Sequence, residues 1–237
     1  MSDSAKKYQN KENYIVPMTV ADREGFLFTQ VYQENKDLIS DKDVLHIGCN
    51  SGPPTVMLDR LGPKSIQGID VNGEAIEMAR VLLPHINFHV ASAHDLPFDD
   101  DSFDSILLFE VFEHLYEEDK SDALSEFSRV LRSGGVILLS VPRAVPGSKD
   151  QKLKQNAYDP HHVSFYFNKQ NVHDDFPGWE CLNLYHETRP NPNNGAHHNS
   201  WVAAYKNPKA EPAKKKKKKN PSAQIRSGMS YGNSHDY

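Results

Sequence analysis

The sequence has few cysteines and no long hydrophobic run. Its 237 residues include only two cysteines, Cys49 and Cys181, which are too few for a disulfide framework or a four-thiolate zinc site. No apolar run approaches the roughly 18 residues of a membrane span, and the first residues, MSDSAKKYQNKENY, lack the hydrophobic stretch of a secretory signal. We therefore expect a soluble, cytoplasmic protein in a reducing compartment, with no membrane span.

Basic residues are sparse along most of the chain and concentrated at its end. Residues 208–237 hold eight Lys or Arg and two Asp or Glu, a net charge of +6, whereas residues 1–207 carry a net charge of −11. The end segment contains the uninterrupted run from Lys214 to Lys219, and it has too little apolar surface to offset the entropy of ordering. We predict a disordered Lys-rich tail over 208–237. It can contact an anionic partner, act as an import signal, or simply add solubility.

Residues 1–207 alternate short β-rich runs with helical patterns, which predicts a single α/β domain with a parallel sheet and helices on both faces. The expected strands are 44–48, 65–71, 87–91, 105–110 and 136–141, followed by an antiparallel pair at 180–188 and 201–206. The expected helices are about 21–38, 55–61, 74–83 and 119–132. We expect 1–20 to be flexible, 144–179 to be irregular, and 144–179 and 189–200 to lie on the substrate side.

A glycine-containing turn follows the first expected strand, within DVLHIGCNSGPP (43–54). Such a turn brings the backbone close to a ligand at the carboxyl edge of the sheet. A dinucleotide fingerprint needs glycine at its first, third and sixth positions, where this chain has Gly48, Asn50 and Pro53. Pro53 and Pro54 also remove N–H donors that would otherwise hold a pyrophosphate. A cofactor without phosphates therefore fits this turn better.

Three further polar runs follow the next strands. Asp70 ends the second strand, where an acid accepts ribose hydroxyls in both NAD and S-adenosylmethionine sites. Together with a turn that lacks donors for a pyrophosphate, Asp70 favours S-adenosylmethionine as the cofactor. The run ASAHDLPFDDDSFD follows the third strand and would place Ser92 and Ala93 where an adenine ring would lie. The fourth run, LLFEVFEHL, presents Glu110, Glu113 and His114 at the end of a buried strand.

Together these runs resemble the class I S-adenosylmethionine-dependent methyltransferases, in their small-molecule, type 11-like branch. The pattern of that branch reads approximately LDIGCGSG, GID, AEDLPF, SFD, EVLEH and LRPGG, and the resemblance covers about residues 40–143. It implies a doubly wound, Rossmann-like, mostly parallel seven-stranded sheet whose last strand is antiparallel. It also implies S-adenosylmethionine as the cofactor. The run HHVSFYF (161–167) is similar to a segment that these enzymes often carry, which makes His161, His162 and Tyr166 candidates for contact with the substrate.

The resemblance also implies roles for individual residues in cofactor binding. The loop from Gly48 to Gly52 would approach the methionine part, Asp70 the ribose hydroxyls, and Ser92 and Ala93 the adenine edge, while Phe109 leads into the active site. The chain departs from the pattern at three positions, with His46 in place of an acid, Asn50 in place of the middle glycine, and Ser92 in place of an acid. The implied cofactor-binding residues are His46, Gly48, Asn50, Gly52, Asp70, Ser92, Ala93 and Phe109.

Glu110, Glu113 and His114 have spacings that place them on one face of a short helix beside the transferring methyl. Three interpretations remain open. His114, with Glu110 assisting, can remove a proton from the acceptor. The three side chains can hold Mg²⁺ or Mn²⁺ together with His161 or His162. Alternatively, they only cap the helix.

The sequence thus predicts an enzyme that transfers a methyl group from S-adenosylmethionine to an oxygen, nitrogen or carbon atom of a small or medium-sized acceptor. One alternative is a metal-dependent RNA 2′-O-methyltransferase. The other is a methyltransferase-like binding or scaffold protein without catalysis, which the departures at His46, Asn50 and Ser92 allow.

Overall fold

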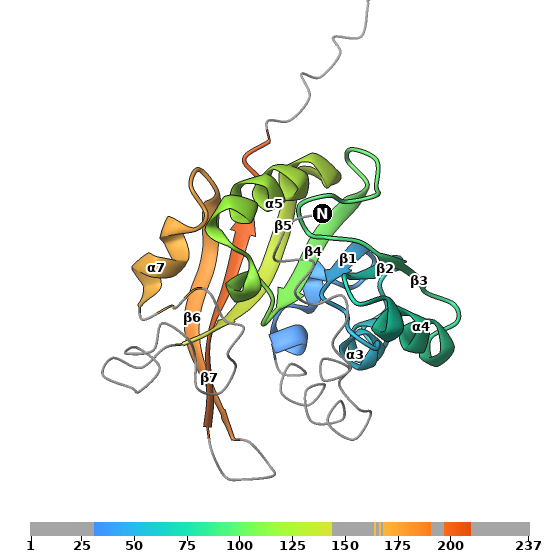
Figure 1. Cartoon of the computed structure of the whole chain (residues 1–237). Helices are drawn as coiled ribbons and strands as arrows, with labels where there is room; N and C mark the ends of the chain where they lie inside the picture. The colour runs from blue at the N-terminus through green and yellow to red at the C-terminus, as the bar shows by residue number, and fades with distance from the viewer. Residues whose placement is uncertain (1–30, 144–163, 165, 167, 191–196, 210–237) are drawn as a thin grey trace, which may run out of the picture.

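The computed structural model describes residues 31–143, 164, 166, 168–190 and 197–209. They form a seven-stranded sheet in the order β3-β2-β1-β4-β5-β7-β6 (Figure 1). The strands are β1 (Asp43–Ile47), β2 (Ser65–Asp70), β3 (Asn87–Val90), β4 (Phe103–Phe109), β5 (Leu131–Pro142), β6 (Glu180–Pro190) and β7 (His197–Lys206). The helices are α3 (Pro53–Asp59), α4 (Gly73–Leu82), α5 (Glu117–Val130) and α7 (Lys169–Asp174), with short 3₁₀ helices η2 (Lys36–Leu38) and η3 (Phe112–His114).

The strand directions confirm the predicted topology. β1 to β5 pair in parallel, and β7, the last strand in the chain, runs antiparallel to β5 and β6. β1 lies between β2 and β4, so the order of the strands reverses at β1. In open α/β sheets such a reversal leaves a crevice at the carboxyl ends of the strands, and ligands bind there.

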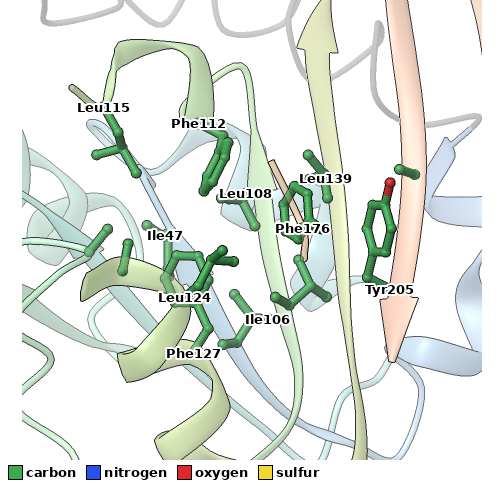
Figure 2. Packing of buried hydrophobic residues seen from close by; sticks show 14 of the residues in the cluster. Ile47, Ile106, Leu108, Phe112, Leu115, Leu124, Phe127, Leu139, Phe176 and Tyr205 are labelled. Atoms are coloured by element: carbon green, nitrogen blue, oxygen red, sulfur yellow. The ribbon is translucent and has the colours of Figure 1, made fainter. Parts of the chain in front are cut away.

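Helices cover both faces of the sheet, as the apolar strands predict. On one face α5 packs Leu124 and Phe127 against Ile106 and other strand residues, and this core continues to Phe176 after α7 (Figure 2). On the other face α3 and α4 pack over a second core, to which Leu58 of α3 contributes. Both faces of the sheet therefore carry a buried apolar core.

Two element boundaries near α5 and β5 differ from the sequence expectation. The helix ends at Val130 and not at Arg132, because Leu131 turns into extended backbone and pairs with Phe103 of β4. Leu131 is fully buried there. The apolar stripe of the helix continues directly into an apolar strand, so the periodicity alone could not mark where one element ends.

The carboxyl-terminal part is more regular than predicted. A short helix, α7, lies inside the segment 144–179 that we expected to be irregular, and Asn168 caps it by accepting from the Asn171 N–H (3.1 Å). The β6–β7 ladder extends to the pair Pro190↔His197, so the expected 189–200 loop is reduced to 191–196. Asn, His and Ser near this turn favour loops in sequence analysis, yet they pair here in a two-stranded ladder.

Several expected segments fall partly or wholly outside the described residues. These are the flexible segment 1–20, most of the helix 21–38, and residues 210–237 of the tail. Within the described part, residues 31–34 are helical, and Lys209 donates to Asp101 Oδ1 (2.7 Å). Among the described helices, none combines the length and the hydropathy needed to cross a membrane.

Candidate functional site

The turn after β1 has left-handed backbone at three positions. Gly48, Asn50 and Gly52 have φ values of 71°, 48° and 99°, and the Asn50 side chain supports the turn by accepting from the Ser51 N–H (2.7 Å). A Cβ atom added to Gly48 would lie 2.3 Å from Cγ2 of Val111, which follows β4. Gly48 is therefore needed for its backbone angle and also because the chain beyond β4 lies against it.

Asp70 connects the turn to the end of β2. Its Oδ2 accepts from the Asn50 N–H (2.9 Å) and its Oδ1 accepts from the Asn72 N–H (2.9 Å). Burial raises the pKa of Asp70, and the backbone donors partly oppose this shift. A carboxylate oxygen can accept two hydrogen bonds, so each oxygen can also accept a hydroxyl from a bound ligand.

The turn after β3 lies beside Asp70. The Ala91 N–H donates to the Asp70 carbonyl (3.0 Å), and Asp95 closes the turn by donating to the Ser92 carbonyl (3.1 Å). Ala93 is buried, and the Ser92 hydroxyl lies 2.8 Å from His94 Nδ1. The structure thus brings the 48–52 loop, Asp70 and the turn that holds Ser92 and Ala93 together at the carboxyl edge of β1, β2 and β3.

His46 lies below the glycine turn as a neutral side chain. It is 2% exposed, and its Nδ1 lies 2.8 Å from the Thr55 hydroxyl of α3. Desolvation lowers the pKa of His46 to about 4, so the imidazole is uncharged at neutral pH. The site therefore has no carboxylate at this position that could attract a ligand's ammonium group.

Glu110 follows β4 in a backbone conformation that is uncommon for a residue with a side chain, with φ of 54°. This turn directs the carboxylate toward β5 and β7, where the hydroxyls of Ser140 and Ser200 both donate to Oε1 (2.7 and 3.1 Å). Strained backbone at a ligand-binding edge often accompanies function. Glu110 is thus held across three strand ends.

Glu113 and His114 lie in η3, the short 3₁₀ helix that follows Glu110. Glu113 is fully buried, while the His114 side chain is 14% exposed, and His114 Nε2 lies 3.9 Å from Glu113 Oε1. Among the described residues, no three His, Cys, Asp or Glu side chains converge as a metal site would require. Glu110 is thus held by serines of two strands, whereas Glu113 and His114 both lie in η3.

The remaining predicted residues take different places. Phe109 is buried and meets Tyr32 edge-on, with ring centroids 5.0 Å apart. Tyr166 is 2% exposed, and its hydroxyl donates to Asp175 Oδ2 (2.5 Å), which makes it part of the core. His161 and His162 lie outside the described residues.

Four residues at this edge were not singled out by the sequence analysis. Val111 packs on Gly48, and Asn72 both donates to Asp70 and accepts from the Glu74 N–H at the start of α4 (3.0 Å). Ser140 and Ser200 hold Glu110. Of these four, only Ser140 gave a signal in the sequence, because it is the one polar residue of the expected strand 136–141.

Comparison with known proteins agrees with this geometry. A family model described as a methyltransferase domain matches residues 45–139. A probable S-adenosylmethionine-dependent methyltransferase of Mycolicibacterium smegmatis is 30% identical over 128 residues, which are 54% of this chain and 49% of that protein. Residues 45–139 are therefore similar to the methyltransferase domains of S-adenosylmethionine-dependent methyltransferases. The matched range contains every described strand from β2 to β4 and all three segments of the site.

Two further comparisons bear on the methyltransferase domain. Phthiotriol/phenolphthiotriol dimycocerosates methyltransferase 1 of Mycobacterium ulcerans is 40% identical over 103 residues, 42% of this chain and 37% of that protein. The chain therefore spans half or less of the length of these two relatives. A Methanosarcina mazei S-adenosylmethionine-dependent methyltransferase has the same fold, with a TM-score of 0.57 at 20% identity, over 70% of this chain and 92% of that chain.

S-adenosylmethionine, the cofactor named in these relatives, fits the residues present at most points. The Asp70 carboxylate retains acceptor capacity for two ribose hydroxyls. The helix after the turn begins with Pro53 and Pro54, which suits a cofactor without phosphates because two backbone donors are missing. The neutral His46–Thr55 pair is the point of poorest fit, because the cofactor carries an ammonium group.

Proposed function

We propose that this chain transfers the methyl group of S-adenosylmethionine to an oxygen, nitrogen or carbon atom of a small or medium-sized acceptor. The observation that carries the proposal is the convergence of the glycine turn, Asp70 and the Ala91–Asp95 turn through direct hydrogen bonds. When bound, the cofactor supplies a sulfonium-activated methyl group, so the protein's contribution is mainly positioning and proton removal.

Three segments would hold the cofactor. Asp70 would accept the ribose hydroxyls, and the backbone of the 48–52 turn would lie along the methionine part. Ala93 is buried at the start of the adenine-side turn and would present its backbone to the base. These groups are already fixed by bonds to one another, so little ordering entropy would be lost on binding.

His114 is the better candidate for the general base. Two serine hydroxyls engage the carboxylate of Glu110, whereas His114 is partly exposed beside the buried Glu113. When His114 Nε2 or Nδ1 takes a proton from the acceptor, the Glu113 carboxylate would stabilise the imidazolium that forms. Glu110, held by the two serines, would then orient the acceptor.

The proposed reaction is tested by S-adenosylhomocysteine release from purified protein across pools of small acceptors. We expect at least one pool to give turnover, and His114→Ala to lower kcat by about 10²- to 10⁴-fold, the usual contribution of a general base. Glu118→Ala, which alters an exposed residue at the start of α5, is the control and should leave kcat unchanged. Full turnover by the His114→Ala protein would show that His114 is not the general base.

The two alternatives predict different results in the same assay. A metal-dependent RNA methyltransferase would lose its activity when a chelator is added and would use RNA as the acceptor. A scaffold protein would release no product and would not bind the cofactor. We favour the small-molecule enzyme because the body of the chain is acidic, with a net charge of −11 over 1–207, and long nucleic acids need a basic surface.

A further inference from the structure

Arg143, the residue directly after β5, is a partly buried cation that has no acidic partner among the described residues. Within the described part of the chain it forms no ion pair, and its Nε is buried without a hydrogen-bond partner. The other arginines near this degree of burial are paired, for example Arg129 with Glu126 and Arg132 with Asp104. Buried polar and charged groups normally have partners, so a guanidinium whose Nε has no hydrogen-bond partner among the described residues points to a ligand.

The surroundings hold this guanidinium in a defined position. Its Cζ lies 5.6 Å from the centre of the Trp201 ring, and the Trp201 indole is fixed by donating from Nε1 to the Tyr166 carbonyl (3.0 Å). His186 of β6 lies beside it, with 3.4 Å between Nη1 and His186 Nε2. A stacked guanidinium loses little freedom on binding and presents its fork of N–H donors to carboxylate or phosphate oxygens.

The place of Arg143 in the fold is on the acceptor side of the proposed site. The Arg143 N–H donates to the Asn199 carbonyl (2.8 Å), which places it where β6 and β7 run on beyond the end of β5 (Figure 1). The Ser164 N–H donates to the Glu113 carbonyl, next to His114, and Tyr166 forms a parallel bridge with Arg143. Two residues span at most about 7 Å, so one short segment links the proposed base to this cation.

We propose that Arg143 anchors an anionic oxygen group, a carboxylate or a phosphate, on the methyl acceptor. This inference rests on the proposed function for the identity of the ligand as an acceptor. The anion would accept from the guanidinium fork above Trp201, with His186 at its side. The acceptor's reacting atom would then face η3, within the length of a small molecule from the anchor.

The experiment uses the fluorescence of Trp201. The chain has two tryptophans, so Trp179→Phe leaves Trp201 as the single reporter under Arg143. This protein is titrated with benzoate and phenyl phosphate, and with the neutral analogues benzamide and benzyl alcohol, each up to about 10 mM, a range that detects weak anion sites. We expect saturable changes with at least one anion and none with the neutral compounds.

Variants then assign the binding to Arg143. In the same background, Arg143→Gln should weaken anion binding by about tenfold to a hundredfold, the usual loss for hydrogen bonds to a charged group. Arg143→Lys keeps the charge without the fork and should lose less. Arg60→Gln changes an exposed arginine that forms no described ion pair and should bind like the parent. Thermal unfolding midpoints check that each variant is folded.

Three results would overturn the proposal. They are equal binding of neutral and anionic probes, unchanged anion binding in folded Arg143→Gln, and no saturable change with either anion. The proposed function is judged separately by calorimetry with S-adenosylmethionine. If the cofactor fails to bind while Arg143 still binds anions, the methyltransferase assignment is wrong and the anion site stands.

Discussion

At the scale of single residues, His46 most clearly separates this site from the family pattern. A carboxylate at that position would leave a charge below the glycine turn, whereas the His46–Thr55 pair is neutral and buried. The Asn50 substitution is milder, because Asn tolerates the positive φ of 48° that the turn requires. The chain therefore retains the shape of the turn and changes its electrostatics.

The lowered pKa of His46 predicts a pH dependence of stability. The folded protein takes up this proton only near pH 4, whereas the unfolded chain takes it up near the ordinary value of 6.5. Between these values the unfolded state binds more protons, so stability is full above pH 6.5 and falls as pH drops toward 4. We expect a loss of about 3 kcal/mol from this group.

Denaturant unfolding of the wild type and of His46→Asn over pH 4 to 7 measures this contribution. The variant can be less stable at every pH, but it should lack the His46 part of the slope. Curves that run parallel for the two proteins over this range would show that His46 does not titrate as a buried neutral group.

At the scale of elements, the site depends on contacts between loops that are distant in sequence. Gly48→Ala places a methyl group 2.3 Å from Val111 Cγ2 at a φ of 71°, which should destabilise the fold and weaken cofactor binding. Gly134→Ala is a matched control, because its φ is 77° and no atom lies within 4 Å of its added Cβ. Gly134→Ala should lower the free energy of unfolding only by the backbone strain, about 1 to 2 kcal/mol.

Comparing the two alanine variants by denaturant unfolding isolates the steric clash. Gly48→Ala should be the less stable by about 1 to 3 kcal/mol, the usual cost of overpacking. The double variant Gly48→Ala/Val111→Ala should recover part of that difference. If Gly48→Ala and Gly134→Ala lose equal stability, the contact between the glycine turn and the chain after β4 is not close.

A second contact between elements fixes the adenine-side loop to α5. Arg129 donates to the carbonyls of Phe98 (2.6 Å) and Leu96 (3.0 Å), and Glu126 accepts from the Leu96 N–H (2.8 Å). Arg129→Ala should lower the free energy of unfolding by about 1 to 3 kcal/mol and speed hydrogen exchange over residues 95–101. Arg60→Ala, at an exposed position, should do neither, and equal exchange in both variants would contradict this role.

Much of this arrangement could be predicted from the sequence, and the limits have physical causes. The parallel strands and the residues at their carboxyl ends follow from apolar runs that end in Gly48, Asp70 and Glu110. The sequence could not show where the Glu110 carboxylate turns, because this depends on a positive φ and on serines 30 and 90 residues away. The sequence likewise could not show that the Tyr166 hydroxyl donates to Asp175, because α7 brings Asp175 next to it.

At the scale of the whole molecule, the described domain extends slightly beyond the expected boundary at residue 207. Asn207 is buried, and its Nδ2 donates to the Ser128 carbonyl (3.1 Å), while Lys209 reaches Asp101. The lysine run Lys214 to Lys219 follows outside the described residues. The acidic body and the basic end of the chain are therefore joined by a short segment that packs on α5.

Two truncations test this division. Removing residues 210–237 should leave the unfolding midpoint and cofactor affinity unchanged, because every described contact is kept. Removing residues 207–237 also deletes the buried Asn207 and should lower the unfolding midpoint, since three backbone carbonyls lose a donor. Loss of cofactor binding on removal of residues 210–237 would show that the tail takes part in the site.

The central claim is that this domain binds S-adenosylmethionine through the segments that meet at Asp70. Titration calorimetry of the wild type, Asp70→Asn and Asp122→Asn with S-adenosylmethionine tests it, where Asp122 is an exposed acid on α5. We predict saturable one-site binding by the wild type and by Asp122→Asn, and affinity at least about tenfold weaker for Asp70→Asn. The account would be contradicted by wild-type protein that shows no saturable binding, or by Asp70→Asn protein that binds as tightly as the wild type.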